Sequence, residues 1–498
     1  MTRPNLSGLA VAASALLVIS VCPAIAQCPD GTPPPCAAQR PAPAPNSVAV
    51  LYFDNLSRDT ADVFLADGLT DELIARLGQV RRLEVKSRFA SQRARDQRTR
   101  DPRALGGTLG AAYLVTGSLR HVGPRVRVIV SLVRAQTGAQ AWGEVYERAG
   151  DLLAIQGEIA QAVAAAIAGR LLPQERTSLT RLPTRDPVAY DLYLRGVGAA
   201  NTLSEAGIRA GLDYLDRAIA RDSGFVDAYL QKALAWTMLA DGYEEGRVAL
   251  ARVREAAERA LRLDSSRAVA YSLLAAAAMQ IDGDSSLALR LAIRGVRLDP
   301  RSWFAHVALT WALLFFGGMD DSAAAEARRG WEADTLSTEA AVNNLWTLTL
   351  LGRFDAFAAV LPRVENVFGP EDMREFDGVV RLAHGDPAAA AERLSWSYYG
   401  GWVAAEYVRA QLALGRREVA QAAVDSMVEA SRHGFYNAFG IARAYAALGD
   451  PDEAFAWLDR SWAQRSGWLM GLRHYPDFTP LHADPRWAAL LRRMGLQP

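Results

Sequence analysis

The hydrophobic pattern in the first third of the chain alternates between strand and helix signals. Residues 47–53 (SVAVLYF) form an almost continuous apolar run before the polar stretch DNLSRD, which predicts a buried strand. Residues 62–80 carry apolar side chains at helical spacing, so we expect an amphipathic helix there. A short strand is predicted at 82–87, and a helix start at Asp101, where proline follows a capping residue.

The next segment has the alternation of three consecutive strands. We expect them at 111–121, 125–135 and 139–148, separated by the turn pairs Gly123-Pro124 and Thr137-Gly138. A helix over 151–171, with an aspartate as its N-cap, then closes the unit. The pattern therefore predicts a small α/β domain over residues 47–172.

From about Asp186 onward the strand pattern disappears and helical hairpins repeat. Successive helix–helix turns are 42, 35, 35, 34, 33, 30 and 34 residues apart. A sustained period near 34 residues predicts hairpins that bury their faces against their neighbours. The turns are placed at Ala206, Val248, Gly283, Gly318, Gly352, Gly385, Gly415 and Gly449, where glycine accepts backbone angles that other residues resist.

Columns of small residues accompany these turns at fixed offsets of five and twelve residues. Side chains seven positions apart lie two turns apart on one helix face, so small residues there let a neighbouring helix approach closely. The expected packing positions are Ala288, Gly295, Ala323, Gly330, Ala390, Ala420, Ala454 and Ser461. The repeats are predicted over residues 186–463, with a closing segment over 464–498.

The amino terminus has the features of an export signal over residues 1–26. A basic start precedes a short apolar run, and Ala24-Ile25-Ala26 offers a cleavage site after Ala26. We expect an exported protein of the periplasm or cell envelope, with an uncleaved membrane anchor as the alternative. Cleavage would leave Cys28 and Cys36, which are expected to form a disulfide loop ahead of a Pro/Ala linker, together covering 27–46. A metal or redox pair is the less favoured interpretation.

Composition and motifs indicate no catalytic, metal or cofactor site. Formal net charge is zero, so global charge gives no attraction to nucleic acid or anionic membranes. The histidines are scattered, and no recognisable metalloprotease, hydrolase or P-loop pattern occurs, so no catalytic residue, metal site or cofactor is predicted. The Gly-rich stretch GGTLGAAY enters a strand rather than a helix, which favours a turn over a dinucleotide site.

Two further patterns have both a structural and a functional interpretation. The segment from Arg81 to Arg103 contains nine basic and three acidic residues, a net charge of +6, and is interpreted as a solvated connector or a contact for an acidic protein. The aromatic side chains of the repeats are expected to be mostly interhelical core, with a minority facing a groove. These aromatic residues include Trp236, Tyr271, Trp303, Trp311, Trp331, Trp346, Trp396 and Trp402.

The repeat pattern resembles the tetratricopeptide repeat. Residues 47–171 resemble the TolB-like amino-terminal domain through VAVLYFDNLS, FLADGLTDELIARL and LGAAYLVTGSLRHVGPRVRVIVSLVRAQTGAQAW, and the ending HYPDFTPLHADPRWAALLRRMG is similar to the closing segment of the same proteins. The resemblance implies an α+β protein, in which a small α/β domain precedes an all-α right-handed solenoid. Many relatives carry an additional amino-terminal DNA-binding, cyclase or kinase module, and none is expected here.

These observations predict an exported, non-enzymatic scaffold that binds protein partners on the concave face of its repeats. We expect no nucleic-acid partner and no spanning segment after signal cleavage. The alternative is a ligand-sensing regulatory protein, whose α/β domain binds a small molecule while the repeats relay the signal to a partner. An enzyme with an unrecognised site and a cytosolic transcription regulator remain as further alternatives.

Overall fold

The computed structural model describes residues 43–57, 62–96, 101–122, 125–149, 152–240, 243–395, 403–433 and 438–496. The predicted signal, the cleavage site at Ala26 and the cysteines Cys28 and Cys36 lie outside these residues, as do Trp396 and Trp402. We call residues 43–168 the sheet region and residues 173–496 the helical region.

The sheet region contains one mixed sheet with the strand order β3-β1-β4-β5-β6, and β2 pairs separately with β4. Pairing is parallel between β1 and its two neighbours and antiparallel along the long meander from β4 to β6. Val50 lies opposite Val115 in the parallel pair. The strands are β1 (Ser47–Val50), β2 (Asp54–Asn55), β3 (Glu84–Val85), β4 (Tyr113–Val122), β5 (Arg125–Arg134) and β6 (Gln140–Ala149).

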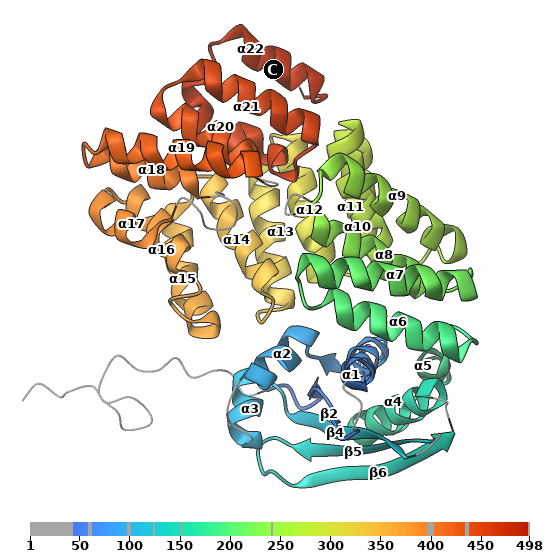
Figure 1. Ribbon diagram of the computed structural model, residues 1–498. Coiled ribbons are helices and arrows are strands. Elements are labelled where there is room, and N and C mark those ends of the chain that lie inside the picture. The colour runs from blue at the N-terminus through green and yellow to red at the C-terminus, as the bar shows by residue number, and fades with distance from the viewer. Residues whose placement is uncertain are drawn as a thin grey trace, which may run out of the picture. The chain divides into compact units, whose positions relative to one another are not determined.

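Helices cover the two faces of this sheet unequally (Figure 1). Helices α1 (Asp62–Gly78) and α4 (Leu152–Ala168) pack on one face, where alternate β5 side chains such as Val128 and Val130 are fully buried. On the other face, Ala49 and Leu114 pack against α2 (Arg88–Asp96) and α3 (Pro102–Leu109). These two short helices leave part of that face uncovered. We call this whole face of the sheet the outer face.

The rest of the described chain is helical, so the predicted α+β fold class is confirmed at this level. Asp186 shows how one helix begins: its carboxylate accepts hydrogen bonds from Val188 N and Ala189 N, and Pro187 occupies the first turn. The helices before the carboxy-terminal segment are α5 (Pro173–Thr180), α6 (Pro187–Ala200), α7 (Glu205–Arg221), α8 (Val226–Leu239), α9 (Gly246–Leu263), α10 (Ala268–Ala277), η1 (Ala278–Asp282), α11 (Ser285–Leu298), α12 (Trp303–Phe316), α13 (Asp320–Ala333), α14 (Thr338–Leu350), α15 (Phe354–Phe368), α16 (Arg374–Ala383), α17 (Pro387–Arg393), α18 (Ala404–Ala413), α19 (Arg417–His433), α20 (Ala438–Leu448) and α21 (Pro451–Gln464).

The glycines assigned to helix–helix turns share one backbone conformation. Their φ angles lie between 65° and 82°, a left-handed region that side chains with a Cβ adopt at a free-energy cost. These residues are Gly283, Gly318, Gly352, Gly385, Gly415 and Gly449. The two earliest assigned turns differ, because Ala206 lies within α7 and Val248 within α9.

The small residues assigned to packing positions are all buried. A Cβ on Gly295 would lie 2.9 Å from the Ser272 hydroxyl, and one on Gly330 would lie 3.1 Å from the His306 Cβ. Each of the two glycines therefore lets a neighbouring helix approach closely. The other buried packing positions are Ala288, Ala323, Ala390, Ala420, Ala454 and Ser461.

The same close packing makes Gly211 sensitive to substitution. A Cβ on Gly211 of α7 would lie 2.7 Å from the Gly196 carbonyl oxygen of α6. We expect Gly211→Ala to lower the free energy of unfolding by about 1–3 kcal/mol, since backbone must move. Gly107→Ala in α3 is the matched control, because its Cβ would meet nothing within 4 Å. Urea titrations in which both variants behave alike would contradict close packing at Gly211.

The carboxy-terminal segment folds back onto earlier helices. It comprises η3 (Gly467–His474), η4 (Pro476–Leu481) and α22 (Pro485–Arg493). The Trp346 Nε1 of α14 donates a hydrogen bond to the Tyr475 hydroxyl at 3.2 Å. A Cβ on Gly283 would lie 2.8 Å from the Met494 carbonyl oxygen, so the chain end also touches the turn after η1. Within the described ranges, no helix is both long and apolar enough to cross a membrane.

Candidate functional site

A cavity of about 800 Å³ lies between the outer face of the sheet and helices α2 and α3. Its floor is made by β4 and β5, and its rim by the segment that joins β1 to β2. Apolar and polar side chains both contribute to the lining. The lining residues are Leu51, Tyr52, Phe53, Asp54, Leu56, Ser91, Ala94, Arg95, Pro102, Leu105, Leu114, Thr116, Gly117, Ser118, Ile129 and Val133.

The period-2 alternation of the strands explains the cavity floor. On β4 and β5, the side chains that point away from the α1/α4 core include Thr116, Ser118 and Ile129, and Ser118 lies opposite Ile129 in the register. Ile129 is 38% exposed and Leu56 is 59% exposed. Large apolar side chains are thus left accessible beside polar ones, which is the usual chemistry of a small-molecule pocket.

An ion pair and a stacked ring form one side of the rim. The Arg95 guanidinium of α2 lies 3.7 Å from the centre of the Tyr52 ring, and its Nη1 donates to Asp67 Oδ2 of α1 at 3.1 Å. Burial raises the pKa of the Tyr52 hydroxyl to about 12, so the phenol stays protonated at neutral pH. The rim therefore presents a neutral phenol and a guanidinium that an aspartate holds in place.

Asp71 lies one helical turn after Asp67, and only one of its two carboxylate oxygens is hydrogen-bonded. Its Oδ2 accepts a hydrogen bond from Asn201 Nδ2 at 3.4 Å, while its Oδ1 has no hydrogen-bond partner among the described residues. Burial raises the pKa of this carboxyl to about 6, and the charge of Asp67 adds to the rise, although Arg88 and Arg95 oppose it. Asp71 is thus a carboxyl that changes charge near neutral pH.

This raised pKa gives a prediction about stability. The native chain holds a proton on Asp71 up to about pH 6, whereas the unfolded chain releases it near its ordinary pKa of 3.8. The contribution of Asp71 to the free energy of unfolding therefore falls as pH rises from 3.8 to about 6. We expect Asp71→Asn to be more stable than the parent chain by about 3 kcal/mol at pH 7 and nearly equal to it near pH 4.

Urea titrations of the parent chain and Asp71→Asn at a series of pH values measure this difference. Asp67→Asn, one helical turn away, is the matched control. It removes a carboxylate that pairs with Arg95, whereas Asp71→Asn removes a carboxylate that has no ion pair among the described residues. We expect Asp67→Asn to be slightly less stable than the parent at pH 7. A stability difference for Asp71→Asn that does not change between pH 4 and pH 7 would show that Asp71 titrates normally.

Helix α2 borders the cavity with one set of side chains and contacts the helical region with another. Ser91, Ala94 and Arg95 line the cavity. The Phe89 ring packs edge-on against Trp303 of α12 with the ring centres 5.8 Å apart, and the Arg93 guanidinium lies 6.0 Å from the centre of the Phe368 ring of α15.

Two further contacts fasten the sheet region to the helical region. Arg88 Nη1 at the start of α2 donates a 2.6 Å hydrogen bond to Asn201 Oδ1, just after α6. Arg301, before α12, donates to the carbonyl oxygens of Leu83 and Gly78 at 3.2 and 3.1 Å. Arg88 thus ties the start of α2 to the end of α6, whereas Arg301 ties the chain between α1 and β3 to the start of α12.

The structure also places the basic segment and the histidines. Several arginines of the basic segment have intramolecular partners: Arg82 pairs with Glu175, and Arg103 donates to the Gln136 carbonyl. Such a segment is not simply a solvated connector. His306 contacts Glu326 and the Pro300 carbonyl oxygen, at 2.6 and 3.0 Å, which is a structural role.

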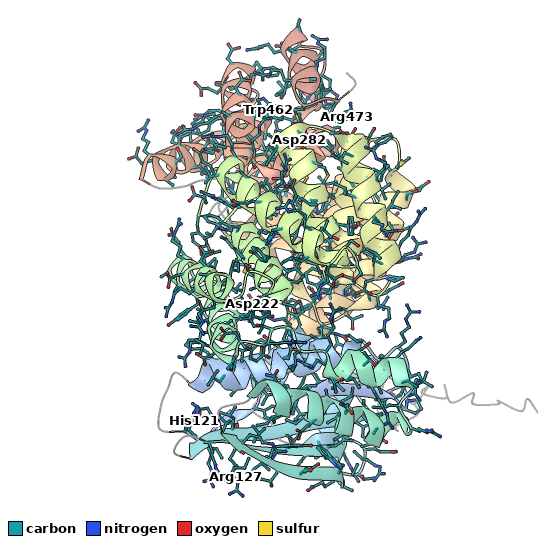
Figure 2. All side chains as sticks on the ribbon, turned by 90° about the vertical axis from the view of Figure 1, so that its right-hand side faces the viewer. His121, Arg127, Asp222, Asp282, Trp462 and Arg473 are labelled. Carbon is teal, nitrogen blue, oxygen red and sulfur yellow. The ribbon has the colours of Figure 1, made fainter. Side chains whose placement is uncertain are left out.

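The histidines are not gathered into a metal site. Figure 2 shows His121 on the sheet region. His306 lies in α12 and His474 at the end of η3. The described residues contain no group of three or more histidine, cysteine, aspartate or glutamate side chains that could hold a metal ion.

The residues that line and border the cavity were not predicted from the sequence. Tyr52 stands at the end of a predicted strand, Asp67 and Asp71 stand within a predicted helix, and Arg88 and Arg95 stand within a predicted connector. One signal was available: Asp67 and Asp71 are four residues apart, and therefore lie on the same helix face within an otherwise apolar segment.

Part of the chain is similar to a curated protein. No family model matches the chain. The chain is 32% identical over 200 residues to the "Putative adenylate cyclase 3" of Rhizobium meliloti (strain 1021). The matched segment is 40% of this chain and 34% of that protein, so the chain spans about a third of the length of this curated relative.

This similarity contradicts the expected non-enzymatic scaffold. A relative named as a cyclase points to a signalling or enzymatic role, and the prediction that the chain is not an enzyme is contradicted by the same finding. The prediction failed because it treated the lack of recognisable catalytic motifs as a sign of a passive protein. Of the functions weighed from the sequence, the ligand-sensing regulator agrees better with the relative.

Proposed function

We propose that this protein is a ligand-sensing regulator of a nucleotide-signalling system. In this proposal the cavity on the outer face of the sheet binds a small molecule, and the helical region passes the bound state to a signalling partner. The observation that carries the proposal is the dual position of α2, which lines the cavity with Ser91 and Arg95 and contacts the helical region with Phe89 and Arg93.

The lining of the cavity suggests the chemistry of the ligand. Ile129 and Val133 lie on the apolar floor with Leu56 beside them, while Asp54 and the Arg95–Asp67 ion pair stand at the rim. An amphipathic molecule with an apolar body and a polar end would bury its body on the floor and hydrogen-bond at the rim.

The relay would begin with a shift of α2. Packed side chains have discrete arrangements, so a ligand that moves Ala94 or Arg95 must also change the packing of Phe89 against Trp303. Arg93 over Phe368 provides a second contact at α15. Both contacts lie at the ends of helices of the helical region, where a small shift can be passed to the next hairpin.

The helical region is proposed to be a tetratricopeptide-type solenoid, and the sheet region a TolB-like domain. The left-handed glycines at the turns and the buried small residues support the repeat. Export, cleavage after Ala26 and a disulfide between Cys28 and Cys36 are retained as proposals. Mass spectrometry of the unreduced native protein tests them, because the proposal requires a chain that begins at Gln27 with the two cysteines joined.

The ligand proposal is tested by extracting small molecules from the chain purified from its native cells. We expect one compound at about equal molar amount with the protein, identified by liquid chromatography and mass spectrometry. Ser118→Trp fills the floor of the cavity and should remove this compound. Val145→Trp is the matched control, since Val145 is half exposed on neighbouring β6 and does not line the cavity. Equal retention by both variants would exclude this cavity as the binding site.

A second candidate function rests on the name of the relative alone: formation of cyclic AMP from ATP by the chain itself. The purified full chain, supplied with ATP and Mg²⁺ or Mn²⁺, is assayed for cyclic AMP. Product formed above the rate of a heat-denatured sample would assign the activity to this chain. Its absence, together with a retained small molecule, would leave the regulator as the function supported.

A further inference from the structure

A second and separate cavity, of about 190 Å³, lies within the helical region. Helices α14, α16, α18 and α20 surround it, together with the start of η4. Its lining includes the apolar side chains of Leu350, Val379 and Leu382 and the charged side chains of Glu406, Arg409 and Arg443. None of these residues lines the sheet cavity, so ligand binding at this second cavity is independent of the function proposed for the first.

The charged wall is a buried ion network. Arg443 is 2% exposed, and its Nε donates to Asp477 Oδ2 at 2.8 Å while its Nη2 donates to Glu406 Oε1. Arg409, at the more open side, lies 3.5 Å from Glu406 Oε1 and 3.2 Å from Asp477 Oδ1. Two carboxylates and two guanidinium groups give the network no net charge.

This network leaves hydrogen-bonding capacity unused at the cavity. Glu406 is 1% exposed, yet its Oε2 accepts no hydrogen bond from any described residue. The Arg409 Nε lies 3.2 Å from Asp477 Oδ1, an ion-pair contact without a hydrogen bond. A buried acceptor left unpaired, such as Glu406 Oε2, raises the free energy of the native state by about 1–3 kcal/mol. A ligand that donated to this oxygen would recover that free energy.

We propose that this cavity binds a free α-amino acid with an aliphatic side chain. The ammonium group of the ligand would donate to Glu406 Oε2, its carboxylate would accept from Arg409, and its side chain would lie against Leu350, Val379 and Leu382. A zwitterion suits a neutral network, since a ligand with a single charge would leave that charge buried without compensation. The volume suits a molecule of roughly nine non-hydrogen atoms, such as leucine.

The test begins with the thermal unfolding of the full chain in the presence of each of the twenty L-amino acids. We expect the aliphatic ones, L-leucine first, to raise the melting temperature by about 3 °C at saturation, because ligand binds only the native state. Titration calorimetry then gives the affinity for L-leucine. If no aliphatic amino acid raises the melting temperature or gives binding heat, the proposal is wrong.

Two analogues separate the roles of the charged groups. L-leucine methyl ester lacks the carboxylate, and 4-methyl-2-oxopentanoate lacks the ammonium group, so each should bind at least about tenfold more weakly than L-leucine. If the oxo acid binds as tightly as L-leucine, Glu406 does not recognise the ligand and the proposal fails.

Variants locate the site. Glu406→Gln should weaken L-leucine binding about tenfold or more, whereas Glu418→Gln, on the exposed surface of α19, should leave it unchanged. Because Glu406→Gln also alters the buried network, Ala383→Trp provides a second variant: Ala383 lines the cavity but is exposed, so a large side chain there can block the cavity without disturbing the ions. Full binding by Ala383→Trp would place the ligand elsewhere and overturn the assignment.

Discussion

Replacing Arg443 with alanine is expected to lower the free energy of unfolding by about 3–5 kcal/mol. The guanidinium is 2% exposed and is shared between Glu406 and Asp477, which are 1% and 4% exposed. Burial alone would lower the pKa of Arg443, but the two carboxylates outweigh it and raise that pKa, so the side chain is a fixed cation. Its loss leaves two buried carboxylates without their main partner. Urea titration followed by tryptophan fluorescence measures the change.

The matched control is Arg432→Ala in α19. Arg432 also pairs with a glutamate, Glu429, but its side chain is 67% exposed, so the change should be below about 1 kcal/mol. Adding Glu406→Gln to Arg443→Ala should restore part of the lost stability, because one of the stranded charges is removed. Equal effects of Arg443→Ala and Arg432→Ala would mean that the network is solvated and contributes little.

Phe478→Ala is expected to lower the free energy of unfolding by about 3–5 kcal/mol. Phe478 in η4 is fully buried, and its ring centre lies 5.6 Å from that of Phe439 and 5.8 Å from that of Trp487. Deleting the ring opens a cavity between the closing segment and α20, which the surrounding helices can fill only in part. The same urea titration gives the difference from the parent chain.

Phe316→Ala, at the end of α12, is the control for this substitution. Phe316 is 40% exposed, so its removal should change the free energy of unfolding by less than about 1 kcal/mol. If Phe478→Ala were as mild as Phe316→Ala, the closing segment would be a loosely attached tail rather than part of the helical core.

The long elements of the fold could be predicted because their hydrophobic period is strong. The helix expected at 62–80 is α1 at Asp62–Gly78, and the strand expected at 125–135 is β5 at Arg125–Arg134. The short strand β3 and the short helix α3 were also expected, but the short helix α2 was not. The segment 88–96 is α2, but its composition is polar and Arg-rich, and the packing of Phe89 on Trp303 that orders it joins residues more than two hundred positions apart.

The sites could not be predicted for a related reason. Thr116, Ser118 and Ile129 alternate with core residues as any solvated sheet face does, so only the positions of α2 and α3 reveal a cavity. In the buried network, Arg443 stands 37 residues after Glu406 and 34 before Asp477. The predicted period of about 34 residues would place such positions on adjacent hairpins, but the period does not say which charged residues face inward.

Hydrogen exchange of the full chain tests most directly whether α2 couples the sheet cavity to the helical region. The indole of Ser118→Trp fills the cavity as a bound ligand would. Val145→Trp adds the same side chain to β6, at a residue that does not line the cavity. With coupling through α2, Ser118→Trp changes amide exchange in residues 88–96 and also around Trp303, whereas Val145→Trp changes neither. A change confined to the sheet strands in both variants would contradict the coupling.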